Sequence, residues 1–199
     1  DMLEKGDAAT GRRSLRDHLV AATAQQGRLY AEGKLTPLAI QVVIKLNPII
    51  LPGNPQATEL GYTEADLQQY HTQVIAPLKK LAEAYPNLRL IAVLEPETIP
   101  EILMGICRTE VSCQKIGDSQ KLVDAAIESL SETSSQNLYL YLGIGHSAWL
   151  TTGGSLDKIP KWLSTFSPTV LSTIKGLATN TAAYLPLVES MIIDRETLG

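Results

Sequence analysis

The sequence lacks both an excess of positive charge and a long apolar run. Its 21 acidic side chains outnumber the 17 basic ones, so the 199 residues carry a formal net charge of -4. We therefore expect no attraction to nucleic acid or to an anionic membrane surface. No stretch approaches the roughly 20 apolar residues that a spanning helix needs, and no signal-peptide pattern opens the chain. Because the chain begins at Asp1 rather than Met, we expect a processed or incompletely represented polypeptide whose targeting segment is not visible.

Cysteine is scarce as well, since only Cys107 and Cys113 are present. The loop between them is long enough to bring the two sulfurs together if the backbone turns. Two unpaired thiols are the alternative. No cluster of histidines accompanies the cysteines, so we expect no metal site, and no other feature suggests a cofactor. A disulfide would suit an oxidising compartment, which makes a secreted, extracellular location the expectation.

What the sequence does have is apolar content. At 44% hydrophobic residues, the chain is long enough to bury a sizeable core, and we expect one domain over residues 1–199. Four short apolar runs predict strands, and amphipathic spacing predicts helices between them. The predicted strands are 39–44, 88–94, 138–144 and 175–180. The predicted helices are 14–30, 63–85 and 114–130, with helical or turn material at 156–163 and 167–174.

Strands that alternate with helices predict right-handed βαβ units, hence an α/β fold with a parallel sheet covered by helices. Within it, Thr63 and Asp66 have the spacing of a helix N-terminal capping pair. In parallel sheets and barrels, chemistry collects where the strands end. Four loops therefore come into question as a functional site: 45–50, 95–98, 143–149 and 179–184.

Three of these loops carry distinctive sequences. They are Leu-Glu-Pro-Glu-Thr at 94–98, Tyr-Leu-Gly-Ile-Gly-His-Ser-Ala-Trp-Leu at 141–150 and Lys-Gly-Leu-Ala-Thr-Asn-Thr-Ala-Ala-Tyr at 175–184. In this order they resemble motifs of the family 6 glycoside hydrolases, which are inverting cellobiohydrolases and endoglucanases that act on cellulose. The resemblance implies a parallel (β/α) barrel of that family's type, only partly represented in this chain.

The resemblance also implies roles for single residues. Glu97 falls on the family's general acid, an Asp, and we count Glu95 beside it as a second catalytic candidate. His146 falls on a sugar-binding histidine and Trp149 on a stacking tryptophan. The last motif suggests three further substrate-binding residues: Lys175, Asn180 and Tyr184.

The residues support a sugar site independently. A strand-end carboxyl among apolar neighbours can have a raised pKa, as a general acid needs, and an indole offers a face for a pyranose. Ordinary structural roles stay open beside these functions. Glu95 or Glu97 could cap the following helix or form a salt bridge, Trp149 could be a core residue, and His146 could be buried with its hydrogen bonds satisfied.

The chain departs from the family at several positions. Ile50 stands at the position of the family's Asp that assists the acid, and Ile49 stands at the position of the neighbouring Arg. Ile44 stands at the position of the family's Tyr that helps distort the sugar. A further Asp and an Asn are Gly143 and Ala183. A shift of about 1 Å in a reacting group can cost on the order of 10²-fold in rate, and losing a proton-transfer partner typically adds roughly 10² or more. Efficient cellulase action is therefore not expected.

Three functions follow from these observations. The first is a family 6-like protein that binds β-1,4-glucan or a cello-oligosaccharide, with hydrolysis lost or weakened. The second is a working inverting β-1,4-glucan hydrolase in which Glu97 is the acid. The third is a recognition or defence protein on the same scaffold, without a sugar. Because further strands of the barrel are not found in the sequence, we also expect a second chain, a cleaved fragment or additional sequence to complete the sheet.

Overall fold

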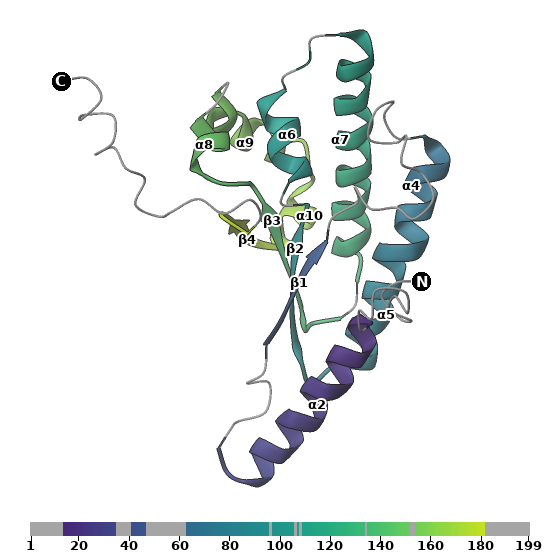
Figure 1. The fold of residues 1–199 in the computed structure, drawn as a ribbon, viewed down its shortest axis with the longest axis vertical. Helices are drawn as coiled ribbons and strands as arrows, with labels where there is room; N and C mark the ends of the chain where they lie inside the picture. The colour runs from purple at the N-terminus through teal and green to yellow at the C-terminus, as the bar shows by residue number, and fades with distance from the viewer. Residues whose placement is uncertain are drawn as a thin grey trace, which may run out of the picture.

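The computed structural model describes residues 14–34, 41–46, 63–95, 97–105, 107, 109–133, 135–151 and 154–181. Helices and strands alternate along them (Figure 1). The elements are α2 (Leu15–Ala31), β1 (Gln41–Leu46), α4 (Glu64–Tyr70), the π-helical turn η1 (His71–Ile75), α5 (Ala76–Ala84), β2 (Arg89–Leu94), α6 (Thr98–Met104), α7 (Glu110–Ser131), β3 (Leu138–Gly143), α8 (Ser147–Thr151), α9 (Ser155–Leu163), α10 (Pro168–Thr173) and β4 (Ile174–Ala178).

The four strands form one parallel sheet in the order β1-β2-β3-β4. Each strand is followed in space by its neighbour in sequence, as successive βαβ units require. The last pairs of the ladders join Leu46 to Leu94 and Gly143 to Ala178. The carboxyl ends of all four strands therefore lie along one edge of the sheet, as the alternation of strands and helices predicts.

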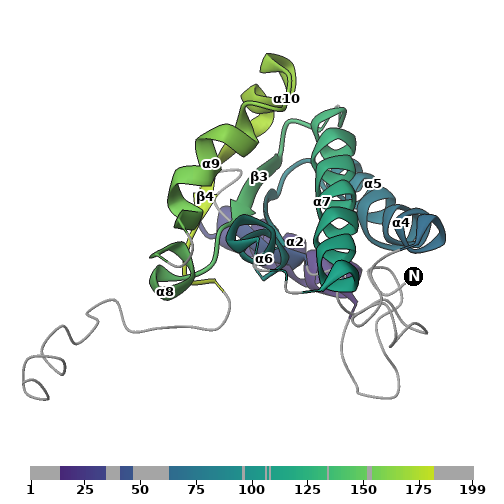
Figure 2. The same ribbon diagram turned by 90° about the horizontal axis from the view of Figure 1, so that it is seen from above.

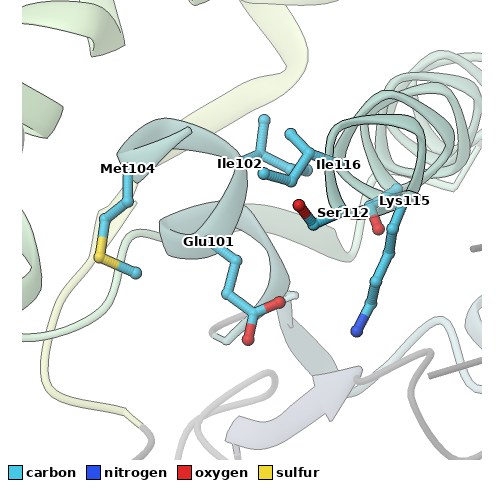
Figure 3. A pocket seen from close by; sticks show the side chains of 7 residues that line it. Glu101, Ile102, Met104, Ser112, Lys115 and Ile116 are labelled. Atoms are coloured by element: carbon cyan, nitrogen blue, oxygen red, sulfur yellow. The ribbon is translucent and has the colours of Figure 1, made fainter. Parts of the chain in front are cut away.

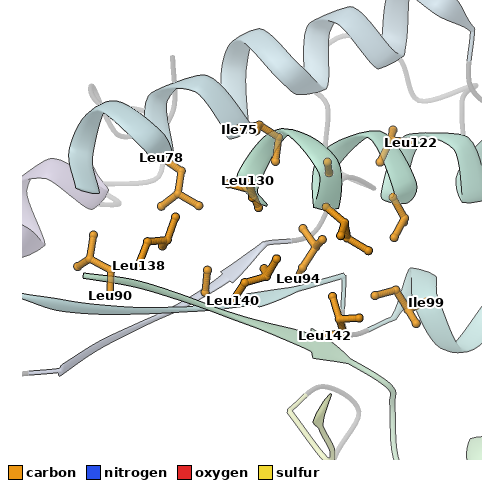
Figure 4. Packing of buried hydrophobic residues seen from close by; sticks show 14 of the residues in the cluster. Ile75, Leu78, Leu90, Leu94, Ile99, Leu122, Leu130, Leu138, Leu140 and Leu142 are labelled. Atoms are coloured by element: carbon orange, nitrogen blue, oxygen red, sulfur yellow. The ribbon is translucent and has the colours of Figure 1, made fainter. Parts of the chain in front are cut away.

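The core lies between the sheet and the helices beside it (Figure 4). Alternate residues of β2 and β3 face α5 and α7, because successive side chains of a strand point to opposite faces. Leucines dominate this layer, and each fully buried one contributes about 1.5–3 kcal/mol. Figures 1 and 2 show α7 and the α4–η1–α5 segment running side by side. The buried layer includes Leu90, Leu94, Leu138, Leu140 and Leu142 from the strands and Ile75, Leu78, Leu122 and Leu130 from the helices.

One helix differs from its prediction. The single helix expected over 63–85 is divided by the π-helical turn η1 at His71–Ile75. Pro77 lies two residues beyond this turn, and a proline inside a helix has no N–H to donate and crowds the carbonyl four residues earlier. A wider turn relieves that conflict. The predicted cap is confirmed, since Thr63 and Asp66 form a capping box at the start of α4.

Other boundaries shift for local reasons. The strand predicted over 175–180 ends at Ala178, because Asn180 takes a left-handed backbone with φ of 56°, which a strand cannot accommodate. Helix α7 starts earlier than predicted because Thr109 caps it together with Ser112. Two helices were missed: α6 holds Pro100 in its first turn, where proline is tolerated, and α8 has only five residues.

Candidate functional site

The loops that follow β2, β3 and β4 lie next to one another at the carboxyl edge of the sheet. Backbone hydrogen bonds extend the β3–β4 pairing beyond the strands. The Ile144 N–H donates to the Ala178 carbonyl at 2.9 Å, and the Asn180 N–H donates to the Gly145 carbonyl at 2.7 Å. The sequence thus places its family-like motifs in one region. We call this region the strand-end cluster, and its residues are Glu95, Glu97, Thr98, His146, Trp149, Asn180 and Thr181.

His146 and Trp149 form a stacked pair in this cluster. Their ring centroids are 4.4 Å apart and the ring planes meet at 29°. The loop carries Trp149 into the first turn of α8, where the Trp149 N–H donates to the His146 carbonyl. His146 is buried, whereas Trp149 is half-buried. The indole is therefore not a fully enclosed core residue, and part of it remains accessible for stacking.

Gly145 allows this stack to form. Its backbone is left-handed, with φ of 81°, and a Cβ atom built on it would lie 2.7 Å from Cε3 of Trp149 and 2.8 Å from Cγ of Pro100. Only a glycine leaves room for both neighbours at this backbone angle. Pro100 belongs to α6, so Gly145 packs closely against both the indole and the helix after β2.

Glu95 is the most enclosed titratable group of the cluster. It is fully buried and has a left-handed backbone, with φ of 52°. The Tyr70 hydroxyl donates to Oε1 of Glu95 at 2.6 Å. Burial raises the pKa of Glu95 well above its ordinary value; the Tyr70 and Thr98 hydroxyls act in the opposite direction, and the Glu97 carboxylate raises it further. Of the two strand-end carboxyls, the one with a raised pKa is therefore Glu95.

Glu97 is less enclosed. It is half-buried and takes the N-cap position of α6, where its carbonyl accepts a hydrogen bond from the Glu101 N–H at 3.3 Å. Its side chain does not cap the helix. Of the two structural roles left open for Glu97, helix capping by the carboxylate is therefore not the one adopted, and the carboxylate stays at the rim of the cluster.

The cluster holds all the buried side-chain polar atoms that have no hydrogen-bond partner among the described residues. These atoms are Oε2 of Glu95, Oγ1 of Thr98, Nδ1 of His146 and Oγ1 of Thr181. Leaving one buried polar group unpaired costs about 1–3 kcal/mol, and native proteins rarely tolerate it without a reason. Unpaired buried polar atoms therefore set the carboxyl edge of the sheet apart from the rest of the described structure.

Sequence reasoning missed Tyr70, Thr98 and Thr181. Thr98 and Thr181 stand inside the quoted motifs, so their hydroxyls could have been considered with the neighbouring candidates. Nothing in the sequence connects Tyr70 with Glu95, because the two residues are 25 positions apart and meet only in the folded chain.

The remaining predicted binding residues have different positions. Asn180 is in the cluster through its backbone bond to Gly145. Lys175 is not, because it is exposed at the start of β4 and lines a hollow of about 280 Å³ at the amino edge of the sheet, together with Ser172 and Thr173. Tyr184 lies outside the described residues.

The structure describes only some of the positions at which the resemblance predicts a departure from the family. Gly143 is the last residue of β3, and Ile44 is in β1, of which only the backbone is described. Ile49, Ile50 and Ala183 lie outside the described residues.

A separate hollow of about 250 Å³ lies between α6 and α7 (Figure 3). Glu101 and Lys115 point toward the same side of it. Partial burial raises the pKa of Glu101, the Lys115 ammonium lowers it, and the Glu97 carboxylate raises it. Near this hollow, the structure joins Cys107 and Cys113 by a disulfide bond that ties the first turn of α7 to the segment before it.

The described part of the chain contains no group of three His, Cys, Asp or Glu side chains arranged to hold a metal ion. None of its helices has the length and apolar character needed to cross a membrane.

Comparison with known proteins identifies relatives for most of the chain. Residues 53–195 match the model of a family described as glycosyl hydrolases family 6. The chain is 29% identical over 191 residues to Exoglucanase A of Cellulomonas fimi, which covers 90% of this chain and 20% of that protein. It is 24% identical over 146 residues to the 1,4-beta-D-glucan cellobiohydrolase CEL6C of Podospora anserina, with 67% of this chain and 34% of that protein covered.

The fold has relatives among solved structures. The catalytic domain of Cellulomonas fimi Cel6B superposes with a TM-score of 0.70 at 27% sequence identity, covering 94% of this chain and 41% of that one. This match confirms the expected α/β-barrel fold, partly represented here. The chain thus spans less than half the length of these relatives. A second chain or cleaved fragment that completes the barrel, and a secreted location, stay predictions.

Proposed function

Because this chain belongs to the glycosyl hydrolases family 6, we propose that it binds a β-1,4-glucan strand at the strand-end cluster, with hydrolysis lost or weakened. One observation carries the proposal: the half-buried Trp149 indole stacks on His146, in a cluster that also holds four buried polar atoms without a partner among the described residues. The names of the relatives support the sugar class, since one is an exoglucanase and another a 1,4-beta-D-glucan cellobiohydrolase.

The chemistry of a glucan matches both halves of the cluster. A pyranose has an apolar face, which packs on the exposed part of the Trp149 indole, and a rim of hydroxyl groups that donate and accept hydrogen bonds. His146 offers ring nitrogens beside that indole. Ligand sites commonly combine an aromatic surface with a few placed polar groups, and this cluster has that composition.

The weak hydrolysis in the proposal rests on the departures from the family pattern. Isoleucines replace the assisting Asp and its Arg neighbour at 50 and 49, and Gly143 ends β3 where the family has an Asp. Without these groups the acid loses the charges that would set its proton affinity. In addition, Glu97 is one methylene longer than the family's Asp, which displaces its carboxyl.

Calorimetric titration of the full chain with cellohexaose tests the binding. We expect heat of binding for the unaltered protein and an affinity about tenfold lower for Trp149→Ala, since stacking of about 1.4 kcal/mol corresponds to that ratio. Lys175→Ala serves as the matched control, because it removes an exposed side chain at the other edge of the sheet. Absence of binding to the unaltered protein, or equal affinity for Trp149→Ala, would contradict the proposal.

Release of reducing sugar from soluble β-glucan tests whether hydrolysis is lost or weakened. We expect the unaltered chain and Glu97→Gln to show equal, negligible rates. A measurable rate that Glu97→Gln abolishes would instead establish the active inverting hydrolase with Glu97 as its acid.

A further inference from the structure

The Glu95 carboxyl has a surrounding that differs from that of an ordinary catalytic acid. Its side chain is 0% exposed and its one hydrogen-bond donor at good geometry is Tyr70, which is itself 2% exposed. Oε2 has no partner among the described residues. Glu95 is therefore sealed below the surface of the cluster, although it lies only two residues from Glu97.

Helix α4 and the π-helical turn η1 place Tyr70 against Glu95. Tyr70 is the last residue of α4, and the next core residue along the chain is Ile75, which is also fully buried. In an α-helix, a step of five residues would rotate the second side chain by about 140° away from the first. The wider π turn brings both side chains to the sheet. The turn therefore keeps the Tyr70 hydroxyl directed at the carboxyl.

No positive charge compensates a negative charge on Glu95 within the described ranges. The groups that act on it are the Tyr70 hydroxyl from α4 and two neighbours at the start of α6, the Thr98 hydroxyl and the Glu97 carboxylate. A buried carboxylate that no cation compensates is strongly disfavoured relative to its neutral form. The Glu97 charge adds repulsion, since two adjacent carboxylates cannot both ionise at low cost.

We propose that Glu95 is a proton-holding residue rather than a catalytic one: Tyr70 orients its carboxyl, and the Glu95–Glu97 pair keeps its proton on the buried member, beyond reach of a glycosidic oxygen. This inference rests on the proposed function and deepens it, because it gives a structural reason for weak hydrolysis. The raised pKa of Glu95 agrees with this arrangement.

The pH dependence of stability tests the inference without any sugar. Folding raises the pKa of Glu95, so the stability that its proton provides is complete below the unfolded-state pKa of about 4.3 and is lost as the pH rises through the raised value. Over that window the contribution changes the folding equilibrium constant by about tenfold per pH unit. Glu95→Gln has no proton to lose and still offers Tyr70 a carbonyl oxygen. We expect this slope to disappear in Glu95→Gln, as measured by urea unfolding from pH 5 to pH 9.

Glu101→Gln is the matched control. Burial also raises the pKa of its carboxyl, but the Lys115 ammonium opposes that shift, and Glu101 is an exposed residue. We therefore expect Glu101→Gln to remove a smaller part of the slope. Equal slopes in the unaltered protein and Glu95→Gln would overturn the inference.

A second measurement does not depend on either variant folding. The ¹³C resonance of the Glu95 side-chain carboxyl, assigned through bonds in the unaltered full chain, should titrate well above the ordinary pKa of glutamic acid. Titration at the ordinary pKa of glutamic acid would overturn the inference. In Tyr70→Phe we expect the midpoint to move upward, because the hydroxyl that stabilises the ionised form is absent. If the stability slope and the Glu95 titration are as expected but cellohexaose does not bind, the proposed function is contradicted and this inference is not.

Discussion

The two edges of the sheet differ in whether their buried polar groups have hydrogen-bond partners. At the amino edge, Asn137 is 7% exposed and its amide N–H groups donate to the carbonyls of Tyr85 and Leu88, each at 2.9 Å. Its side-chain oxygen accepts from the Ser135 hydroxyl, and its carbonyl accepts from the Leu90 N–H. The side-chain amide and the backbone carbonyl of this asparagine thus have partners, so the residue ties the loop before β3 to the start of β2.

At the carboxyl edge, the loops hold four buried polar atoms without a partner in the described part of the chain, together with two left-handed non-glycine residues, Glu95 and Asn180. Such features cost free energy, and they persist where function requires them. The comparison teaches that polar groups are paired at the amino edge and partly unpaired at the carboxyl edge, which is the edge where parallel barrels generally carry their functional residues.

The largest expected effect comes from Gly145→Ala. The new Cβ would collide with Trp149 and Pro100 at a left-handed backbone angle. Overpacking of about 1–3 kcal/mol and backbone strain of about 1–2 kcal/mol add up to a loss of about 3 kcal/mol in the free energy of unfolding. Because the indole must move, cellohexaose affinity should fall as well. Urea unfolding and calorimetry measure the two effects.

Gly33→Ala is the control for that prediction. Gly33 has a similar φ of 68° but open space around its Cα, so only the backbone strain should remain. A loss for Gly145→Ala no larger than that for Gly33→Ala would show that the stack is not sterically locked.

Asn137→Ala should have the next largest effect, confined to stability. It removes the Asn137 donor from the Leu88 carbonyl and from the Tyr85 carbonyl, which keeps the Leu88 N–H. We expect this to cost about 2 kcal/mol, with cellohexaose affinity unchanged under conditions where the protein is folded. Gln136→Ala alters the exposed neighbour and should change stability by less than about 0.5 kcal/mol. A drop in affinity for Asn137→Ala would break the division between the two edges.

The smallest change in stability is expected for His146→Phe. The phenyl ring keeps the stack with Trp149 while removing an Nδ1 atom that has no partner, so unfolding free energy should change by less than about 1 kcal/mol. Affinity should fall about fivefold, because one hydrogen bond to a sugar hydroxyl is worth about 1 kcal/mol. Thr98→Val offers a parallel case for a buried hydroxyl. A clear loss of stability in both variants would mean that these polar atoms support the fold.

Much of the fold could be predicted because its signals are local. The apolar runs of β2 and β3 and the Thr63 cap are legible in short windows of sequence. The π-helical turn could not be predicted from a short window, since it depends on how Tyr70 and Ile75 both reach the core. Helix α8 was too short to show a period.

The candidate site was predictable in composition but not in its roles. Motifs at strand ends identified Glu97, His146 and Trp149, and parallel topology brought their loops together. The same motif reasoning included Lys175, which strand direction places at the amino edge.

By itself, the sequence determined the order of strands and helices and the presence of a glucanase-like motif at three strand ends, because hydrophobic periodicity and short motifs are properties of neighbouring residues. Only the tertiary structure decided which carboxyl is buried and which polar atoms lack partners. Burial and proton affinity depend on side chains that are distant in sequence, as the contact between Tyr70 and Glu95 shows, and the free energy of a buried proton is set by all of them together.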